Sequence, residues 1–156
     1  MKKLLAGATI LLMTTSSFAA TTGTLLLQGL VAQKISVFVT SQAIASTLDL
    51  STSQTDLVVA TMNEKSNSKS GYKMTISSAN LSKLKRTDGL EILSYTMKYN
   101  GSAVALSSAA GSTITNSSAS SVNVNRNVSI SYTGISAELM VEGTYADTVT
   151  FTIAAN

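Results

Sequence analysis

The sequence predicts an all-β fold built as a two-sheet antiparallel sandwich. Seven or eight short segments alternate apolar and polar residues with the period of two that a strand imposes, and turn residues separate them. Beyond the N-terminus, no window keeps a helical period for long. The 156 residues suffice for one domain plus a targeting segment, and an apolar content of 44% with 12% charged residues excludes a disordered chain.

Residues 1–19 have the layout of a secretory signal peptide. Two lysines precede the apolar run Leu4–Met13, and the segment ends on Ser-Phe-Ala, with small residues at the third-last and last places. We expect cleavage between Ala19 and Ala20. The alternative, a retained membrane anchor, is disfavoured because the apolar run is too short to span a bilayer. The product is therefore expected to be exported.

The next segment, Gly23–Val31, is apolar on both faces if it is extended. One face holds Leu25, Leu27, Gly29 and Val31, and the other holds Leu26, Gln28 and Leu30. Such a strand must be covered, and we expect the cover to come from another copy of the protein. The alternative is an edge strand of its own domain with Gly29 in a bulge.

The first half of the expected sandwich begins with Lys34–Thr40, whose alternation predicts a half-buried strand in which Phe38 is the one apolar residue facing outward. Two short apolar segments, Ser46–Leu50 and Asp56–Met62, follow. Asn63–Ser70 is polar and is expected to be a turn region.

Tyr72–Ser77 alternates cleanly and is expected to be a strand in the middle of a sheet. Ala79–Gly89 follows as a polar, basic connection. Leu81 and Leu84 lie three residues apart, which is compatible with one helical turn there.

The second half contains the longest alternating segment, Glu91–Tyr99, and then Asn100-Gly101, the strongest hairpin signal in the chain. The expected partner strand is Ser102–Leu106. Ser107–Ser121 is expected to be an exposed loop with one short strand at Ser112–Thr115. The remaining apolar segments are Val122–Tyr132, Leu139–Val141 and Tyr145–Ala154. The five tyrosines mostly fall on inward faces, which predicts a place in the core.

The composition argues against an enzyme. The chain has no Cys and no His, which excludes disulfides, zinc-thiolate sites and the usual general base. The acidic pairs Glu138/Glu142 and Asp88/Glu91 show no sign of a glycosidase site, and alternating Asp with Gly, as in a calcium loop, is absent. We therefore expect no catalytic residue, no metal and no cofactor.

Six basic residues gather in a short part of the chain, namely Lys65, Lys69, Lys73, Lys83, Lys85 and Arg86. They could face an acidic glycan or a lipid headgroup, but solvated surface charge is the simpler interpretation. No aromatic residues interleave with them in the way that nucleic-acid binding requires. We expect no nucleic-acid partner.

Three stretches resemble the chaperone-usher pilins, in particular the spore coat protein U-like secreted fibre and coat subunits. Gly23–Val31 is similar to the pilin N-terminal extension, in which one glycine interrupts alternating apolar residues. The other two are Ser70–Asn80 in mid-chain and Gly143–Ile153 at the end. Two features depart from many pilins, because the chain lacks a disulfide and ends Ala-Ala-Asn without a nearby tyrosine.

The resemblance implies an immunoglobulin-like β-sandwich of pilin type that lacks one strand. The implied partners are a periplasmic chaperone, an outer-membrane usher and neighbouring subunits of a homo-polymer or mixed fibre. Carried over by position, the donor-strand residues would be Leu25, Leu27, Gly29 and Val31. The implied domains are a signal peptide (1–19), a donor-strand extension (20–33) and a pilin-like sandwich (34–156).

Two functions follow as expectations. The first is a structural subunit of a surface fibre or coat that is exported through the periplasm, is assembled by donor-strand exchange and performs no chemistry. The second is a monomeric secreted binding module, for example a carbohydrate-binding adhesin, that uses the loops rich in Ser and Asn. The two functions differ in whether the mature protein polymerises through its N-terminal segment.

Overall fold

The computed structural model describes residues 21–156, so the expected signal peptide, residues 1–19, lies outside the described residues. The chain divides into two units after Val31. We call the second unit, Ala32–Asn156, the body, and every strand and helix of the described residues lies within it. Residues 21–34 form neither helix nor strand.

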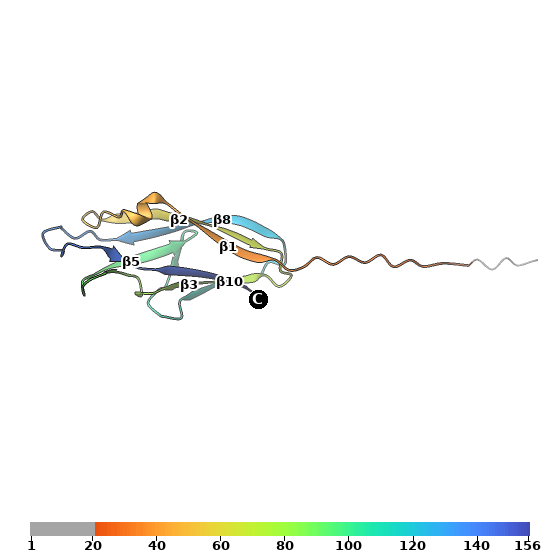
Figure 1. Ribbon diagram of the computed structural model, residues 1–156. Coiled ribbons are helices and arrows are strands. Elements are labelled where there is room, and N and C mark those ends of the chain that lie inside the picture. Colours follow the sequence, from red (N-terminus) through yellow and green to blue (C-terminus); the bar gives the residue numbers. More distant parts are fainter. Residues whose placement is uncertain (1–20) are drawn as a thin grey trace, which may run out of the picture. The chain divides into compact units, whose positions relative to one another are not determined.

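The body consists of short strands and a single turn of 3-10 helix among the described residues (Figure 1). In chain order the elements are β1 (Ile35–Ser41), η1 (Ala43–Ser46), β2 (Gln54–Ser66), β3 (Tyr72–Ser78), β4 (Lys83–Arg86), β5 (Ile92–Tyr99), β6 (Ser102–Val104), β7 (Ser112–Asn116), β8 (Val122–Tyr132), β9 (Tyr145–Ala146) and β10 (Val149–Ala155).

The strands form two antiparallel sheets. The larger sheet has the order β1-β2-β8-β5-β4-β9, with β6 also paired to β5, and the smaller sheet has the order β10-β3-β7. The alternation of Tyr72–Ser77 correctly predicted a central strand, because β3 is the middle strand of the small sheet. The all-β, antiparallel expectation is confirmed, and the arrangement is consistent with a β-sandwich.

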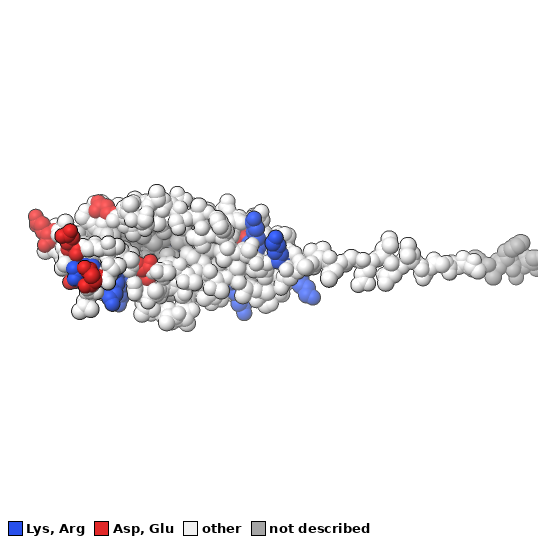
Figure 2. Space-filling model, in the orientation of Figure 1, with Lys and Arg blue, Asp and Glu red and all other residues white. Residues whose placement is uncertain are grey.

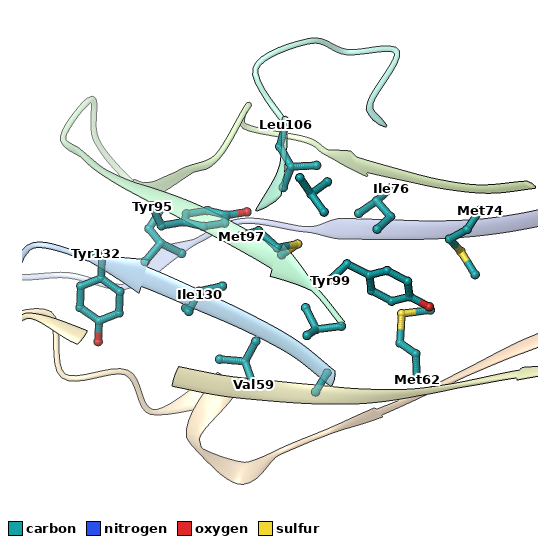
Figure 3. Packing of buried hydrophobic residues seen from close by; sticks show 14 of the residues in the cluster. Val59, Met62, Met74, Ile76, Tyr95, Met97, Tyr99, Leu106, Ile130 and Tyr132 are labelled. Carbon is teal, nitrogen blue, oxygen red and sulfur yellow. The ribbon is translucent and has the colours of Figure 1, made fainter. Parts of the chain in front are cut away.

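One hydrophobic core lies between the two sheets. Met74 and Ile76 of the small sheet point toward residues of the large sheet such as Met62 and Met97, and all four are almost fully buried (Figure 3). The tyrosines confirm their predicted place, since four are buried and Tyr145 packs against the core while partly exposed. The period-two alternation of the strands thus generates the core directly.

Burial gives the tyrosines a titration behaviour that can be measured. Loss of hydration raises the pKa of Tyr72, Tyr95 and Tyr132 above the ordinary value, with a further rise at Tyr95 from its hydrogen bond to Asp147. Above about pH 10 the unfolded chain therefore loses tyrosine protons that the folded chain retains. The free energy of unfolding should therefore fall as the pH rises above about 10.

Urea unfolding across this alkaline range measures the effect. The Tyr95→Phe variant, which lacks one of the titrating hydroxyls, should show a shallower decline than the parent. Equal slopes for the two proteins would contradict the role of Tyr95.

The long strand β2 corrects one expectation. Asn63–Ser70 was expected to be a turn region, but β2 continues to Ser66. Its inward face keeps the alternation with Met62, Glu64 and Ser66, all buried. The carboxylate of Glu64 accepts hydrogen bonds from the hydroxyls of Tyr72 and Tyr99, so a charged residue can occupy an inward position.

Three further segments have structures that their apolar residues alone do not define. The helical turn that the spacing of Leu81 and Leu84 allows does not form, because residues 81 and 82 have positive φ and the chain then enters strand β4 with Leu84 inward. The apolar segment Ser46–Leu50 begins at the last residue of η1 and continues as a loop whose leucines pack against the core. The segment Leu139–Val141 lies at a turn, and Leu139 is 81% exposed.

The other strand and turn expectations are confirmed, apart from shifts at their ends. Asn100 and Gly101 both have positive φ, as a two-residue hairpin requires, and they connect β5 to β6. The last predicted strand is divided in two, because the chain leaves β9 in the large sheet and enters β10 in the small sheet. Asp147 occupies this crossing point.

Candidate functional site: an open groove along one edge of the body

The first and last strands leave one edge of the body open. Within the described residues, β1 pairs only with β2, and β10 pairs only with β3. The two strands belong to different sheets, yet they lie next to each other (Figure 1). Each is seven residues long, so two rows of main-chain groups face the same opening without a strand between them.

Side-chain burial shows the same opening. Along β5, in the middle of the large sheet, the inward residues from Leu93 to Tyr99 are at most 5% exposed. On β10 the inward residues Val149, Phe151 and Ile153 are only half-buried, and Val39 of β1 is 39% exposed. The core is therefore covered at its centre and uncovered along this edge.

The uncovered region forms an apolar groove, which we call the edge groove. It has a volume of about 230 Å³. A second hollow of about 730 Å³ adjoins it at the end of the body near η1, and Ala45, Leu48, Leu84 and Asp147 line both. Further lining residues come from both sheets, including Val39, Met97, Ile130, Val149 and Phe151. The groove thus exposes the core itself.

Asp147 is the carboxylate of the edge groove. It accepts hydrogen bonds from Ser78 Oγ at 2.5 Å, from the Tyr95 hydroxyl at 2.7 Å and from the backbone N–H of Asn80 at 2.9 Å. Its own turn adds the N–H of Thr148 at 2.7 Å. These contacts hold the chain where it crosses between the sheets, so the carboxylate has a structural role there.

Replacing Asp147 by alanine should destabilise the body by about 2 to 3 kcal/mol, because the Tyr95 hydroxyl and the Ser78 hydroxyl lose their acceptor in a half-buried site. Chemical denaturation followed by circular dichroism measures the loss. Glu142→Ala, which removes an exposed carboxylate on the same side of the molecule, is the control and should change stability by less than about 0.5 kcal/mol. An equal loss in both variants would contradict this role of Asp147.

The edge groove was not predicted as a set of residues. Leu48 belongs to a segment expected to be apolar and Leu84 to one expected to be a polar connection, and nothing in the sequence indicated that they would lie together beside β10. The predicted donor residues lie in the other unit of the chain. Leu25, Leu27 and Val31 are each more than 80% exposed, and no heavy atom lies within 4 Å of a Cβ placed on Gly29.

The six basic residues that are close together in sequence do not form one surface. Lys65 and Lys69 lie where β2 leads into β3, whereas Lys85 and Arg86 lie at the opposite end of the body on β4. Arg86 also pairs with Glu91 at 2.7 Å. Proximity in sequence misled here, because β3 carries the chain from one end of the body to the other.

Other kinds of site have no support in the described part of the chain. Residues 21–156 contain no group of three or more acidic, cysteine or histidine side chains that could hold a metal ion. They also contain no helix of the length and apolar character needed to cross a membrane. No protein family model matches the sequence, and no curated protein matches it significantly.

Proposed function

We propose that this protein is a structural subunit of a surface fibre or coat, and that it is assembled by donor-strand exchange. In this proposal the body is an immunoglobulin-like sandwich of pilin type that lacks one strand. The observation that carries the proposal is the edge groove, where two strand edges and the core are open along the same side. The role requires no catalytic group.

The missing element has the properties of a strand. β1 and β10 approach within 8 Å between Cα atoms at several positions, so they would have to separate to about 10 Å to admit a strand between them. The inserted strand would then find main-chain donors and acceptors on both sides, and alternate side chains would enter the groove. Seven residues of strand span about 23 Å, whereas the eleven residues from 21 to 31 span about 36 Å when extended. The extension is therefore long enough to fill the opening.

The side chains of the extension supply the free energy. Leu25, Leu27 and Val31 are proposed to enter the groove, and Gly29 is proposed to lie where the groove leaves no room for a Cβ. Each large aliphatic side chain contributes about 1.5 to 3 kcal/mol on burial, so three contribute roughly 5 to 9 kcal/mol before the cost of association.

Asn67 favours insertion into a different copy. The Asn67 side chain accepts a hydrogen bond from the backbone N–H of Lys34 at 2.6 Å and donates one to the carbonyl of Ala32 at 2.9 Å. The backbone N–H of Asn67 donates a hydrogen bond to the Lys34 carbonyl at 3.1 Å. These bonds hold the residues that lead into β1, which contain no turn. The extension of the same chain would need a sharp reversal there to enter its own groove.

The proposed assembly route begins at the N-terminus. Residues 1–19 are proposed to direct export to the periplasm, where a chaperone would cover the edge groove and an outer-membrane usher would exchange the chaperone for the next subunit. The mature protein would then reside in a cell-surface fibre or be secreted as a coat. The open groove supports this route, because an exposed core needs a temporary cover before assembly.

A denaturing gel run without boiling tests the proposal. Mature protein, residues 20–156, should give a ladder of polymers that collapses to the monomer on boiling. A variant lacking Ala20–Val31 should keep its β-rich circular dichroism spectrum and give only the monomer. A single monomer band from the mature protein, or a ladder that survives the deletion, would contradict the proposal and favour the monomeric module.

A further inference from the structure

We propose that the two ends of the body are complementary docking surfaces, so that the lysine-rich end of one copy docks on the acidic end of the next copy. The inference rests on the proposed function, because it describes how successive subunits of the polymer meet. Figure 2 shows acidic side chains gathered at one end of the body, with basic ones beside them, and mainly basic side chains at the other end.

The first surface, which we call the lysine end, lies where β1 begins and β2 ends. It consists of Lys34, Lys65, Lys69 and Lys73. None of these four lysines forms an ion pair with another described residue. The nearby carboxylate of Glu64 is buried and is occupied by tyrosine hydroxyls and by Arg126 at 3.7 Å. The lysine end is therefore strongly positive.

The second surface, which we call the acidic end, is built from the β4–β5 turn and the segment between β8 and β9. Its carboxylates are Asp88, Glu138 and Glu142, which are exposed, and Glu91, which is half-buried and pairs with Arg86. Lys83 and Lys85 also lie on this half of the body, but they project from the outer face of β4. Excess negative charge thus remains on the loops that form the end itself.

Arg86 joins the two loops of the acidic end. Its Nε pairs with Glu91 at 2.7 Å, and its Nη1 donates to the Glu142 carbonyl at 3.2 Å. The N–H of Thr87 donates to the Thr144 carbonyl at 2.9 Å, which ties the backbones together. The acidic end is therefore held in place before any partner arrives.

Apolar side chains lie among these carboxylates. Leu90 on the turn is 86% exposed, and Leu139 on the neighbouring segment is 81% exposed. Ile92 and Val141 are also about half exposed. Exposed leucines beside charged residues are typical of a protein-protein contact, in which an apolar centre is surrounded by a polar rim.

The connection to the extension identifies the partner as a second copy. The extension joins the body at Ala32, two residues before Lys34. A neighbour that binds the extension in its groove therefore also lies close to the lysine end. The hollow that adjoins the edge groove is lined by Met140, Val141 and Glu142 of the acidic end. A copy whose extension enters the groove from this end places lysines opposite carboxylates, whereas entry from the other end places lysines against lysines.

A charge-reversal mixture of the full mature chain tests this docking. Glu138→Lys/Glu142→Lys makes both ends basic, and Lys65→Glu/Lys69→Glu/Lys73→Glu makes both ends acidic. Each variant alone should form the boil-sensitive ladder at least about tenfold more slowly than the parent, because equal charges now meet. An equimolar mixture of the two variants should restore the rate, since each basic end now finds an acidic end.

Two controls separate charge position from total charge and from misfolding. Glu138→Gln/Glu142→Gln and Thr96→Lys/Asn127→Lys raise the net charge equally, but the second pair lies on the exposed face of the large sheet. Only the first pair should slow assembly, and circular dichroism should show every variant folded. Raising the salt concentration from about 0.02 M to about 0.5 M should slow the parent and leave the glutamine variant less affected.

The outcomes distinguish this inference from the proposed function. Variants that form ladders at the parental rate would overturn end-to-end docking while the donor-strand proposal stands. Folded variants that fail to assemble even as a mixture would overturn it as well. A parent that forms no ladder would overturn the donor-strand proposal and this inference together.

Discussion

Leu27→Asp is expected to abolish polymer formation while leaving the body folded. In the proposed fibre the Leu27 side chain is buried in the edge groove of a neighbour. Its loss removes about 1.5 to 3 kcal/mol of burial, and an unpaired carboxylate in an apolar groove costs several kcal/mol more. A total above about 4 kcal/mol weakens association by roughly a thousandfold or more.

The adjacent residue supplies the matched control for this variant. Gln28→Asp adds the same charge one position further along the extension, on the face that points away from the groove. It should form ladders on an unboiled denaturing gel, whereas Leu27→Asp should give only monomer with an unchanged circular dichroism spectrum. Equal assembly by both variants would mean that this face of the extension does not enter a groove.

Glu64→Ala is expected to cause the largest loss of stability among single substitutions in the body. Glu64 is 2% exposed and accepts from the hydroxyls of Tyr72 in the small sheet and Tyr99 in the large sheet. Alanine would leave both hydroxyls buried without this acceptor and Arg126 without its carboxylate. The expected loss is about 3 kcal/mol or more, a large part of the usual stability of about 5 to 15 kcal/mol.

Urea denaturation followed by circular dichroism measures this loss. Lys65→Ala alters the next, exposed residue of β2 and should change stability by less than about 0.5 kcal/mol. If Glu64→Ala unfolds at the same urea concentration as Lys65→Ala, the carboxylate does not connect the two sheets energetically.

Much of the fold could be predicted because alternation reports directly on a sheet with one buried face. Tyr72–Ser77 and Glu91–Tyr99 alternate without interruption, and both form strands near those bounds. The prediction failed where a polar residue is inward, as at Glu64, since the tyrosines that satisfy it lie 8 and 35 residues away in sequence. Period alone does not reveal such distant partners.

The candidate site was less predictable because it depends on which strands lack neighbours. The sequence indicated that Val149 and Phe151 face inward, but it did not indicate that β10 would end one sheet beside the free edge of β1. Asp147 carried no signal, because its partners Ser78 and Tyr95 come from two other strands. The extension stays a prediction as a donor strand, made because its segment is apolar on both faces.

Intermolecular cross-linking tests the central claim most directly, namely that the extension of one copy fills the edge groove of another. The chain has no cysteine, so each introduced cysteine is unique. Leu27→Cys protein would be mixed with a longer, tagged protein that carries one cysteine in the edge groove, at Val39, Ser41 or Ala45. In the control mixture the tagged protein carries its cysteine at Asn125, on the outer face of β8. We predict disulfide-linked heterodimers with one or more groove positions and none with Asn125→Cys, whereas no cross-link to the groove, or equal cross-linking to Asn125→Cys, would contradict the account.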